Sequence, residues 1–429
     1  MKILRWNDPD FAARVAALDR RAQSSETVRA TVAEIIEQIR TQGDEALLRL
    51  TAHFGGPALR NPAALRVPPA ELASAEASLD AATRQALQTS HANIAAFARK
   101  GLRSDWEMTN PQGAVVGERY RPFERVGIYV PGGSSPLVST ALMTVTLAEV
   151  AGCREIVAAT PSDREERIAP PLLAALSLAG ATEVFCMGGA QAIAAMALGT
   201  ENIGRVAKIF GPGNAYVVEA KRQLFGTVAI DLLPGPSEIL VLADESARAD
   251  WIAADLLAQA EHGTDSAMLL ITTSESLLAA VAISLAQQAA TLPRAEELHA
   301  AMEHNGWLVL ARSLDDAIDL ANRYAAEHVS IAFRDPQSVA DRLTTAGAIF
   351  LGGFSPVAAG DFIAGPSHTL PTGGAGKSFS GLTVDQFQRR TSIIRYDADS
   401  LRKSMDAIER FSAVEGLAAH GRSGTIRFE

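Results

Sequence analysis

The sequence predicts an α/β protein with two domains, each built on a doubly wound parallel sheet. A helical N-terminal region precedes these domains, and a short, mostly helical C-terminal tail follows them. Two observations support this class. From about Gly117, short apolar runs alternate with helical stretches, and most of the runs end in glycine or proline clusters. After Asp231 the same alternation begins again, which indicates a second unit of the same kind.

The composition is that of a folded protein, and it argues against several functional classes. The 429 residues are 48% hydrophobic, which is enough for the cores of two or three domains. A net charge of −10, without a basic run interleaved with aromatic residues, disfavours a nucleic-acid partner. The first residues lack the apolar segment of a signal peptide, and no later stretch approaches the length that spans a bilayer. We therefore expect a cytoplasmic protein without a membrane partner.

The only cysteines are Cys153 and Cys186, which are too few and too far apart for a disulfide framework or a thiolate zinc site. Cys186 falls inside an apolar strand-like run, and Cys153 follows an apolar helical run. Both are expected to be small buried hydrophobic residues rather than nucleophiles. Any metal must then be held by nitrogen and oxygen ligands.

Residues 1–116 are predicted to form the helical N-terminal region, part of which packs on the second α/β domain. Between residues 11 and 105, Ala, Leu, Arg and Glu recur at helical spacing. Gly55-Gly56 and the loop from Pro57 to Pro69 interrupt the pattern. The helices are expected to carry ordinary charged outer faces.

Residues 117–236 are predicted to form the first α/β domain, on the nucleotide side of the protein. Its expected strands are Val126–Val130, Glu155–Thr160, Glu183–Met187 and Lys208–Phe210. In a doubly wound, Rossmann-like sheet, the loops that leave the carboxyl ends of the strands line the ligand crevice. The glycine clusters that follow these runs are therefore expected to open toward one cleft.

Residues 237–379 are predicted to form the second α/β domain, which carries most of the candidate metal and acid/base residues. Its expected strands are Glu238–Leu242, Met268–Ile271, Trp307–Leu310, Val329–Phe333 and Ala348–Leu351. Residues 380–429 are a polar tail with helical pieces such as Asp399–Phe411. A terminal segment this poor in core residues is expected to pack on another surface, such as a partner subunit.

Three residues at strand ends of the first domain are candidates for nucleotide binding. Gly211-Pro-Gly-Asn214 follows a strand and opens a helix, which is the context of a phosphate site. It lacks the third glycine of G-x-G-x-x-G, and a tight turn with Asn214 as the helix cap explains it equally well. Tyr129 before one glycine loop and Gln191 after another add groups that stack on adenine or hydrogen-bond to ribose.

The stretch Asp255-Leu-Leu-Ala-Gln259-Ala-Glu-His262-Gly263 predicts the last turns of a helix that Gly263 ends. Gln259 and His262 are three residues apart and share a helical face. An amide oxygen and an imidazole nitrogen can share a zinc ion, but two ligands do not close a site. Taken alone, a solvated pair at a helix end is the simpler interpretation.

Further polar groups gather in the second half of the chain. Glu327 and His328 lie where a helix gives way to a strand, and this pair suits proton transfer near neutral pH, although a solvated loop-end His is the plainer alternative. Asp361 and His368 lie in a loop dense in glycine and proline, where loops more often carry function. Asp361 would add an anionic oxygen to Gln259 and His262, and His420 is the last candidate in the tail.

Seven stretches, in this order, resemble the histidinol dehydrogenase family from about Glu118 to His420. They are Gly127-Ile-Tyr-Val-Pro-Gly-Gly133, Gly188-Gly-Ala-Gln-Ala-Ile193, Lys208-Ile-Phe-Gly-Pro-Gly-Asn-Ala215, Gly235-Pro-Ser-Glu238, Leu257-Ala-Gln-Ala-Glu-His-Gly263, Glu327-His328 and Gly365-Pro-Ser-His-Thr-Leu-Pro-Thr372. One departure is Ser367, where many relatives have Asn before the His, and this affects only a detail of that loop.

The resemblance implies roles for individual residues. Zinc is expected on Gln259, His262, Asp361 and His420, with His420 supplied by the other subunit of a homodimer. NAD is expected on Tyr129, Gln191 and Asn214. The substrate, L-histidinol, is expected to contact the four zinc ligands together with Ser237, His328, His368 and Glu415, of which Glu415 again comes from the partner. Glu327 and His328 are expected to be the acid/base pair.

The resemblance also implies a reaction. Oxidation of a primary alcohol to a carboxylate needs two hydride transfers, each to one NAD, with an aldehyde between them. His328 is expected to take the hydroxyl proton in the first step, and Glu327 to activate water for the second. Zinc is expected to act mainly as a template that holds the imidazole and amine of the substrate.

Two alternatives remain at this point. A related zinc- and NAD-dependent dehydrogenase could act on another small polar alcohol, such as a dihydroxy sulfonate. Glu415 argues against it, because a carboxylate suits a cationic amine and repels a sulfonate. The second alternative is a non-catalytic nucleotide- or metabolite-binding protein in which Glu327 and His328 are idle.

Overall fold

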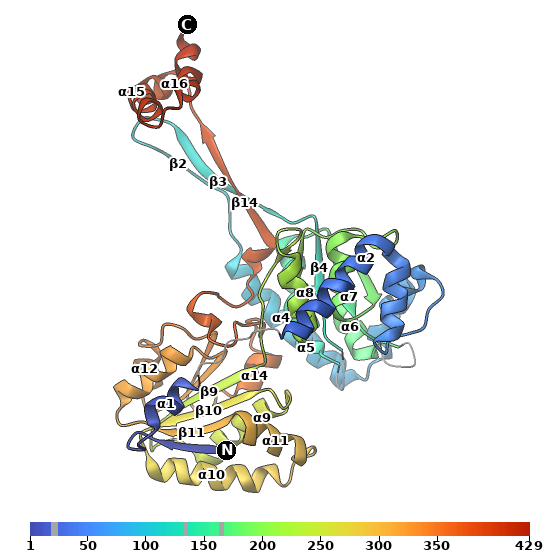
Figure 1. The fold of residues 1–429 in the computed structure, drawn as a ribbon, viewed down its shortest axis with the longest axis vertical. Coiled ribbons are helices and arrows are strands. Elements are labelled where there is room, and N and C mark those ends of the chain that lie inside the picture. Colours follow the sequence, from blue (N-terminus) through green and yellow to red (C-terminus); the bar gives the residue numbers. More distant parts are fainter. Residues whose placement is uncertain (19–24, 133–135, 163–166) are drawn as a thin grey trace.

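Two parallel sheets form separate α/β domains, and a long arm projects from them (Figure 1). The computed structural model describes residues 1–18, 25–132, 136–162 and 167–429. Both sheets are covered by helices on their two faces, which confirms the predicted α/β class. Among these residues, no helix has the length and apolar character needed to cross a bilayer.

The first sheet has five parallel strands in the order β6-β5-β4-β7-β8. The strands are β4 (Arg125–Tyr129), β5 (Glu155–Thr160), β6 (Glu183–Cys186), β7 (Lys208–Phe210) and β8 (Ala229–Ile230). All four predicted strands are confirmed, with ends that differ by a residue at most. The two-residue β8 was not predicted, because so short a run gives no periodic signal.

Helices cover both faces of this sheet, and several come from the N-terminal region. One face packs on α4 (Ala81–Gly101), α5 (Val138–Ala151) and α6 (Pro170–Leu178). The other packs on α2 (Glu26–His53), α7 (Gly189–Leu198) and α8 (Ala215–Leu224). The short α3 (Pro69–Ala75) lies against α6. Alternate residues of β4 and β5 therefore enter two different cores.

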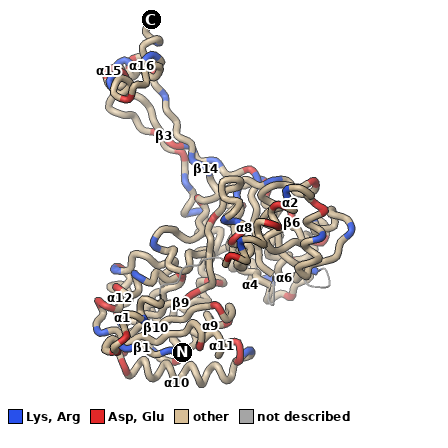
Figure 2. Tube along the Cα trace, in the orientation of Figure 1, with Lys and Arg blue, Asp and Glu red and all other residues tan. Residues whose placement is uncertain are grey.

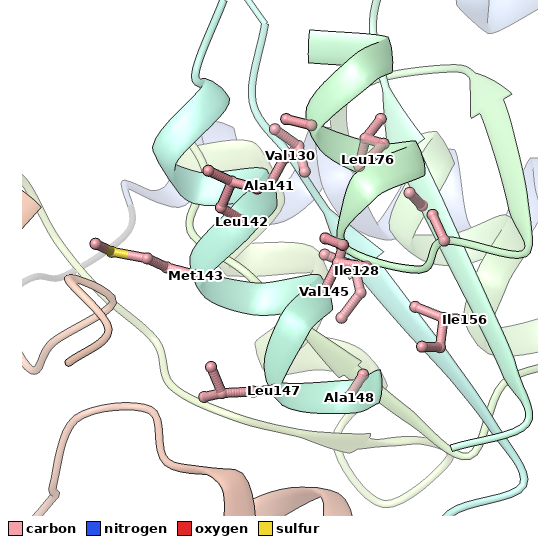
Figure 3. Close-up of a cluster of buried hydrophobic side chains, with 14 of the residues drawn as sticks. Ile128, Val130, Ala141, Leu142, Met143, Val145, Leu147, Ala148, Ile156 and Leu176 are labelled. Carbon is pink, nitrogen blue, oxygen red and sulfur yellow. The ribbon is translucent and has the colours of Figure 1, made fainter. Parts of the chain in front are cut away.

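Helix α5 lies between the first sheet and the second domain. Its buried residues follow one another from Thr140 to Ala148 and include three threonines, so the helix is buried on most sides. Figure 3 shows Ala141, Val145 and Ala148 packed toward Ile128 and Ile156 of the sheet. In the same view the Met143 side chain extends away from this cluster. Its sulfur accepts the backbone N–H of His368, from the second domain, at 3.4 Å.

The second sheet has six parallel strands in the order β1-β11-β10-β9-β12-β13. They are β1 (Lys2–Arg5), β9 (Glu238–Ala243), β10 (Ala267–Thr272), β11 (Gly306–Leu310), β12 (His328–Ala332) and β13 (Ala348–Leu351). The five predicted strands are confirmed. The edge strand β1 was not predicted, because a four-residue run with a charge at each end is not distinguishable from irregular chain.

Helices again cover both faces of the second sheet. One face packs on α9 (Ala249–Ala260), α10 (Glu275–Ala289) and α11 (Ala295–Asn305). The other packs on α1 (Phe11–Ala16), α12 (Leu314–Tyr324) and α13 (Pro336–Ala340). The six-residue α14 (Val357–Phe362) lies against α9. The N-terminal region is thus divided, since β1 and α1 belong here while α2 and α4 cover the first sheet.

The arm contains an antiparallel sheet with two helices at its tip (Figure 1). Its elements are β2 (Trp106–Thr109), β3 (Val115–Pro122), β14 (Gln388–Arg395), α15 (Ala398–Val414) and α16 (Ala418–Thr425). The tail was expected to be mostly helical, and β14 is an addition to that prediction. The sequence of β14 is polar and no residue of it is buried, so it lacks the one-sided apolar alternation that reveals a strand. Acidic and basic residues occur on the arm and on both domains (Figure 2).

The loop of residues 365–373 contacts the carboxyl edge of the first sheet and the amino edge of the second sheet. The Gly373 N–H donates to Glu238 at 3.0 Å, and Glu238 is the first residue of β9. Earlier in the loop, His368 Nε2 lies 3.1 Å from Ser139 Oγ in the first turn of α5, which follows the carboxyl end of β4. The first sheet therefore presents its carboxyl edge to this loop, while the second presents its amino edge.

A buried ion pair fixes the glycine loop after β7. Lys221 of α8 is paired with Asp231, and both side chains are fully buried. Lys221 also donates to the Gly211 carbonyl at 3.0 Å, and the Gly211 N–H donates to Asp231 Oδ2 at 2.7 Å. Gly211 has φ +109°, and a Cβ there would lie 2.1 Å from the Tyr129 carbonyl oxygen. Only glycine allows this approach of the two loops.

Replacement of Lys221 by Met should destabilise the protein by about 3–5 kcal/mol, because it leaves Asp231 buried without its counter-ion. Urea unfolding followed by circular dichroism measures the change. The matched control is Arg29→Met, which breaks an exposed ion pair with Glu26 and should cost less than about 1 kcal/mol. Equal midpoints for the two variants would show that the buried pair does not stabilise this loop.

Candidate active site

Glu327 and His328 lie at the amino end of β12, immediately after α12. Ala325 ends α12 in the left-handed region with φ +54°, which turns the chain sharply into the strand. β12 lies between β9 and β13, so both side chains are enclosed, and their exposed fractions are 6% and 3%. This excludes the alternative of a solvated histidine at a loop end.

The hydrogen bond of His328 determines its tautomer. Its Nδ1 lies 3.1 Å from the Glu238 carbonyl oxygen, which only accepts, so Nδ1 must carry the proton. Nε2 then has the lone pair, has no hydrogen-bond partner among the described residues, and lies 3.6 Å from Asp361 Oδ1. Burial lowers the pKa of His328 and outweighs the opposing effect of Asp361. The ring is a neutral base with its free nitrogen directed toward Asp361.

The Glu327 carboxylate is held by the residues that begin β9. Its Oε2 accepts from Ser237 Oγ at 2.5 Å and from the Glu238 N–H at 2.9 Å. Burial raises the pKa of Glu327 to about 8, although these two hydrogen bonds act in the opposite direction. Such a carboxyl group can take up or release a proton near neutral pH. Ser237 was expected to contact substrate, and in this chain its hydroxyl is bonded to Glu327.

Gln259 and His262 lie at the end of α9, beside α14. The helix ends at Ala260, three residues before the predicted stop at Gly263, and the His262 N–H donates to the Gln259 carbonyl in a tighter turn at 3.2 Å. Gly263 has φ +135° and follows this turn. Gln259 is buried, and its amide nitrogen has no partner among the described residues.

Burial and charge shift the pKa values of several candidate groups of the second domain. Burial lowers the pKa of His262, and the charge of His328 lowers it further. Burial raises the pKa of Asp361, and His328 opposes that change. Burial likewise lowers the pKa of His368 to about 4, with His328 and His262 as further causes. The three imidazoles are therefore favoured in the neutral form that ligates metals.

The donor set fits a zinc ion as far as this chain supplies it. Gln259, His262 and Asp361 offer an amide, an imidazole and a carboxylate, which are suitable oxygen and nitrogen ligands. The unpartnered atom of the buried Gln259 side chain is its amide nitrogen, which only donates, so Gln259 would have to ligate zinc through its amide oxygen. Within the part of the chain that the structure describes, no three His, Cys, Asp or Glu side chains form a metal site. Of the four expected zinc ligands, only His262 and Asp361 are residues of these types in the second domain.

The three nucleotide candidates lie at the carboxyl edge of the first sheet. The Tyr129 hydroxyl accepts the Gly189 N–H at 3.0 Å, which ties β4 to the start of α7. Gln191 is buried in the first turn of α7. Asn214 caps α8, and its Oδ1 accepts from the backbone of residues 216 and 217. This is the helix-cap interpretation, and it leaves the first turn of α8 beside the Gly211 loop. Gly133, the last residue of the first motif, lies outside the described residues.

Glu415 and His420 lie on the arm and not in the pocket of their own chain. Both line a hollow of about 460 Å³ between α15 and α16, together with Tyr396 and Phe411. Figure 1 shows these helices at the far end of the arm from α9 and α14. The structure thus packs α14, which carries Asp361, against α9, which carries Gln259, while His420 lies on the arm.

Some site residues were missed by sequence reasoning. Ser139 and Thr140 contact His368 Nε2 at 3.1 and 3.4 Å, and neither gave a sequence signal, because short polar residues at a helix start are usually caps. Glu238 also lies beside Glu327 and His328, and no role was predicted for it. Its signal was present, since an ionisable residue opened an otherwise apolar strand.

The cysteine predictions are confirmed. Cys153 and Cys186 are both buried, and neither forms a disulfide within the described part of the chain. Burial raises the pKa of the Cys153 thiol to about 11, which disfavours the nucleophilic thiolate.

Comparison with known proteins shows similarity along the whole chain. The family model for histidinol dehydrogenase matches residues 18–428. The chain is 44% identical to a histidinol dehydrogenase of Xylella fastidiosa (strain Temecula1), over 100% of this chain and 99% of that protein. It is 43% identical to that of Geobacillus kaustophilus, over 94% and 95% of the two chains. The crystal structure of histidinol dehydrogenase from Elizabethkingia anophelis superposes with a TM-score of 0.94 at 35% identity, covering 100% of this chain and 98% of that one.

Proposed function

The chain belongs to the histidinol dehydrogenase family of oxidoreductases, and from this we infer that it oxidises L-histidinol to L-histidine through L-histidinal, in the last steps of histidine biosynthesis. Each of the two steps transfers a hydride to one NAD. The observation that carries the proposal is the free Nε2 of His328, a buried neutral base that faces Asp361 and lies beside the Glu327 carboxyl group.

His328 is the proposed base of the alcohol step. Its Nε2 takes the hydroxyl proton while the carbinol carbon loses a hydride to the nicotinamide. Asp361 Oδ1 at 3.6 Å stabilises the imidazolium that forms. The Nδ1–H bond to the Glu238 carbonyl keeps the ring oriented throughout.

Glu327 is the proposed base of the aldehyde step. It takes a proton from water as the oxygen adds to the aldehyde carbon, and the resulting hydrate loses the second hydride. The sum is one alcohol, two NAD and one water converted to a carboxylate, two NADH and three protons. The buried position of Glu327, which raises its pKa to about 8, suits proton transfer near neutrality.

Two cofactors complete the proposed site. Gln259, His262 and Asp361, with His420 of the partner subunit, would hold zinc, which supplies a template for the imidazole and amine of the substrate. Tyr129, Gln191 and Asn214 would contact NAD at the carboxyl edge of the first sheet. Ser237 and His368 line the substrate side of the cleft.

The arm supports a homodimer in which subunits exchange tails. Large apolar side chains of the arm are exposed, namely Met108 (53%), Ile394 (70%), Phe411 (68%) and Val414 (71%). Phe362, next to Asp361, is 62% exposed and would be covered by a partner. In this arrangement Glu415 of one subunit reaches the substrate amine in the other. Two cysteines without a disulfide among the described residues agree with a cytoplasmic location.

The zinc-loaded protein should release two NADH for each L-histidinol consumed, measured by absorbance against substrate loss. His328→Ala and Glu327→Ala should each lower kcat by about 10²–10⁴-fold, because each removes a base. Glu327→Ala should affect L-histidinal oxidation most. The exposed His304→Ala is the control. Near-normal rates in both base variants would refute the assignment, and turnover of a dihydroxy sulfonate instead of L-histidinol would point to the alternative substrate.

Tail exchange can be tested with hybrid dimers. His262→Ala and His420→Ala homodimers should both be inactive, because each site then lacks a zinc ligand. In a hybrid with one chain of each kind, exchange combines both defects in one site and leaves the other intact. Co-expressed, doubly tagged hybrids should regain about half of the wild-type activity per dimer. If each tail served its own subunit, both sites would stay defective and the hybrid would be inactive.

A further inference from the structure

Glu238 makes more contacts with the acid/base pair than any substrate or metal candidate does. It begins β9, next to β12, and is 1% exposed. Its backbone N–H donates to Glu327 Oε2 at 2.9 Å, and its backbone carbonyl accepts from His328 Nδ1 at 3.1 Å. Each backbone group of this one residue therefore orients a different member of the pair.

The Glu238 side chain holds the same region from the other side. Its Oε1 accepts the backbone N–H of Glu327 at 3.3 Å and that of Gly373 at 3.0 Å. Its Oε2 accepts from the Tyr324 hydroxyl at 3.3 Å. The carboxylate thus joins the end of α12, the start of β12 and the loop that carries His368.

We propose that Glu238 is a positioning residue, whose carboxylate anchors the Glu327 backbone and the 365–373 loop so that the base of the aldehyde step stays in place. It touches no reacting atom. The proposal rests on the function proposed above for Glu327, but the anchoring itself does not require turnover. A substitution of the Glu238 side chain removes the anchor of Glu327 but keeps the backbone carbonyl that holds the His328 ring. The two effects can therefore be measured separately.

The donors and acceptors of the side chains predict which substitution of Glu238 is tolerated. Gln can present its amide oxygen to the N–H groups of Glu327 and Gly373, and its amide nitrogen can donate to the Tyr324 oxygen. Glu238→Gln therefore retains all three contacts without the charge. Glu238→Ala leaves the buried N–H of Glu327 and the part-buried N–H of Gly373 without their acceptor.

The experiment compares Glu238→Ala and Glu238→Gln on L-histidinol and L-histidinal, with kcat and KM measured separately. Glu238→Ala should lower kcat on L-histidinal by about 10²-fold and on L-histidinol by less, with little change in KM. Glu238→Gln should lose less than about tenfold on either substrate. The matched control is Asp44→Ala, since Asp44 is a buried carboxylate that accepts two N–H bonds of Asn202 in the first domain. It should leave the ratio of the two rates unchanged.

A second readout does not depend on activity. Amide hydrogen exchange, followed by mass spectrometry, should accelerate at Glu327 and Gly373 in Glu238→Ala but not in Glu238→Gln. If wild-type protein failed to oxidise L-histidinol, the proposed function would be wrong, and exchange would still decide the anchoring. If Glu238→Ala does not fold, Tyr324→Phe removes one donor to Oε2 and should shift the rate ratio in the same direction by less.

Three results would overturn the proposal. The first is unchanged exchange at Glu327 and Gly373 in Glu238→Ala, or an unchanged rate ratio in Tyr324→Phe where that variant replaces it. The second is an equal loss on both substrates, as a general loss of structure gives. The third is a Glu238→Gln variant as impaired as Glu238→Ala, which would make the charge and not the hydrogen bonds responsible.

Discussion

The parallel pairing of β9 with β12 is the constraint on which the candidate site depends. It places the first residues of the two strands side by side, so that Ser237 and Glu238 face Glu327 and His328. Every hydrogen bond that orients the pair comes from this junction. Because both strands are internal, water is kept from the two side chains. Burial therefore raises the pKa of Glu327 and lowers that of His328, which favours the neutral form of each. Position and proton affinity therefore have one structural cause.

The two domains use opposite ends of similar sheets. The first presents the carboxyl ends of β4, β6 and β7, which lead into glycine turns. The second contributes the amino ends of β9 and β12 and the end of α9, where ionisable side chains are packed. The loop of residues 365–373 spans the junction through His368, Ser139 and Gly373. In the proposed function, the nucleotide on the first domain and the metal-held substrate on the second would meet at this junction.

Much of this architecture was predictable because the apolar strand runs and their glycine ends are strong local signals. All nine predicted strands are present, but β1, β8 and the arm strands were missed. The strand β14 is polar, and none of its residues is buried within one chain, so its sequence lacks the apolar alternation that predicts a strand. In the site, the residue types of Gln259, His262 and Asp361 were evident, whereas the part played by Glu238 depends on strand pairing. Glu238 and His328 are 90 positions apart, and the pairing of two strands so far apart in the chain produces no local sequence pattern.

The most direct test of this account is the tautomer of His328. Protein labelled with ¹⁵N at histidine, with the His328 signals assigned by their loss in His328→Gln, reports which ring nitrogen carries the proton. Above the lowered pKa of His328, we expect a proton on Nδ1 and a free Nε2. A proton on Nε2 would mean that the Glu238 carbonyl does not orient the ring, and it would contradict the role of His328 as the base facing Asp361.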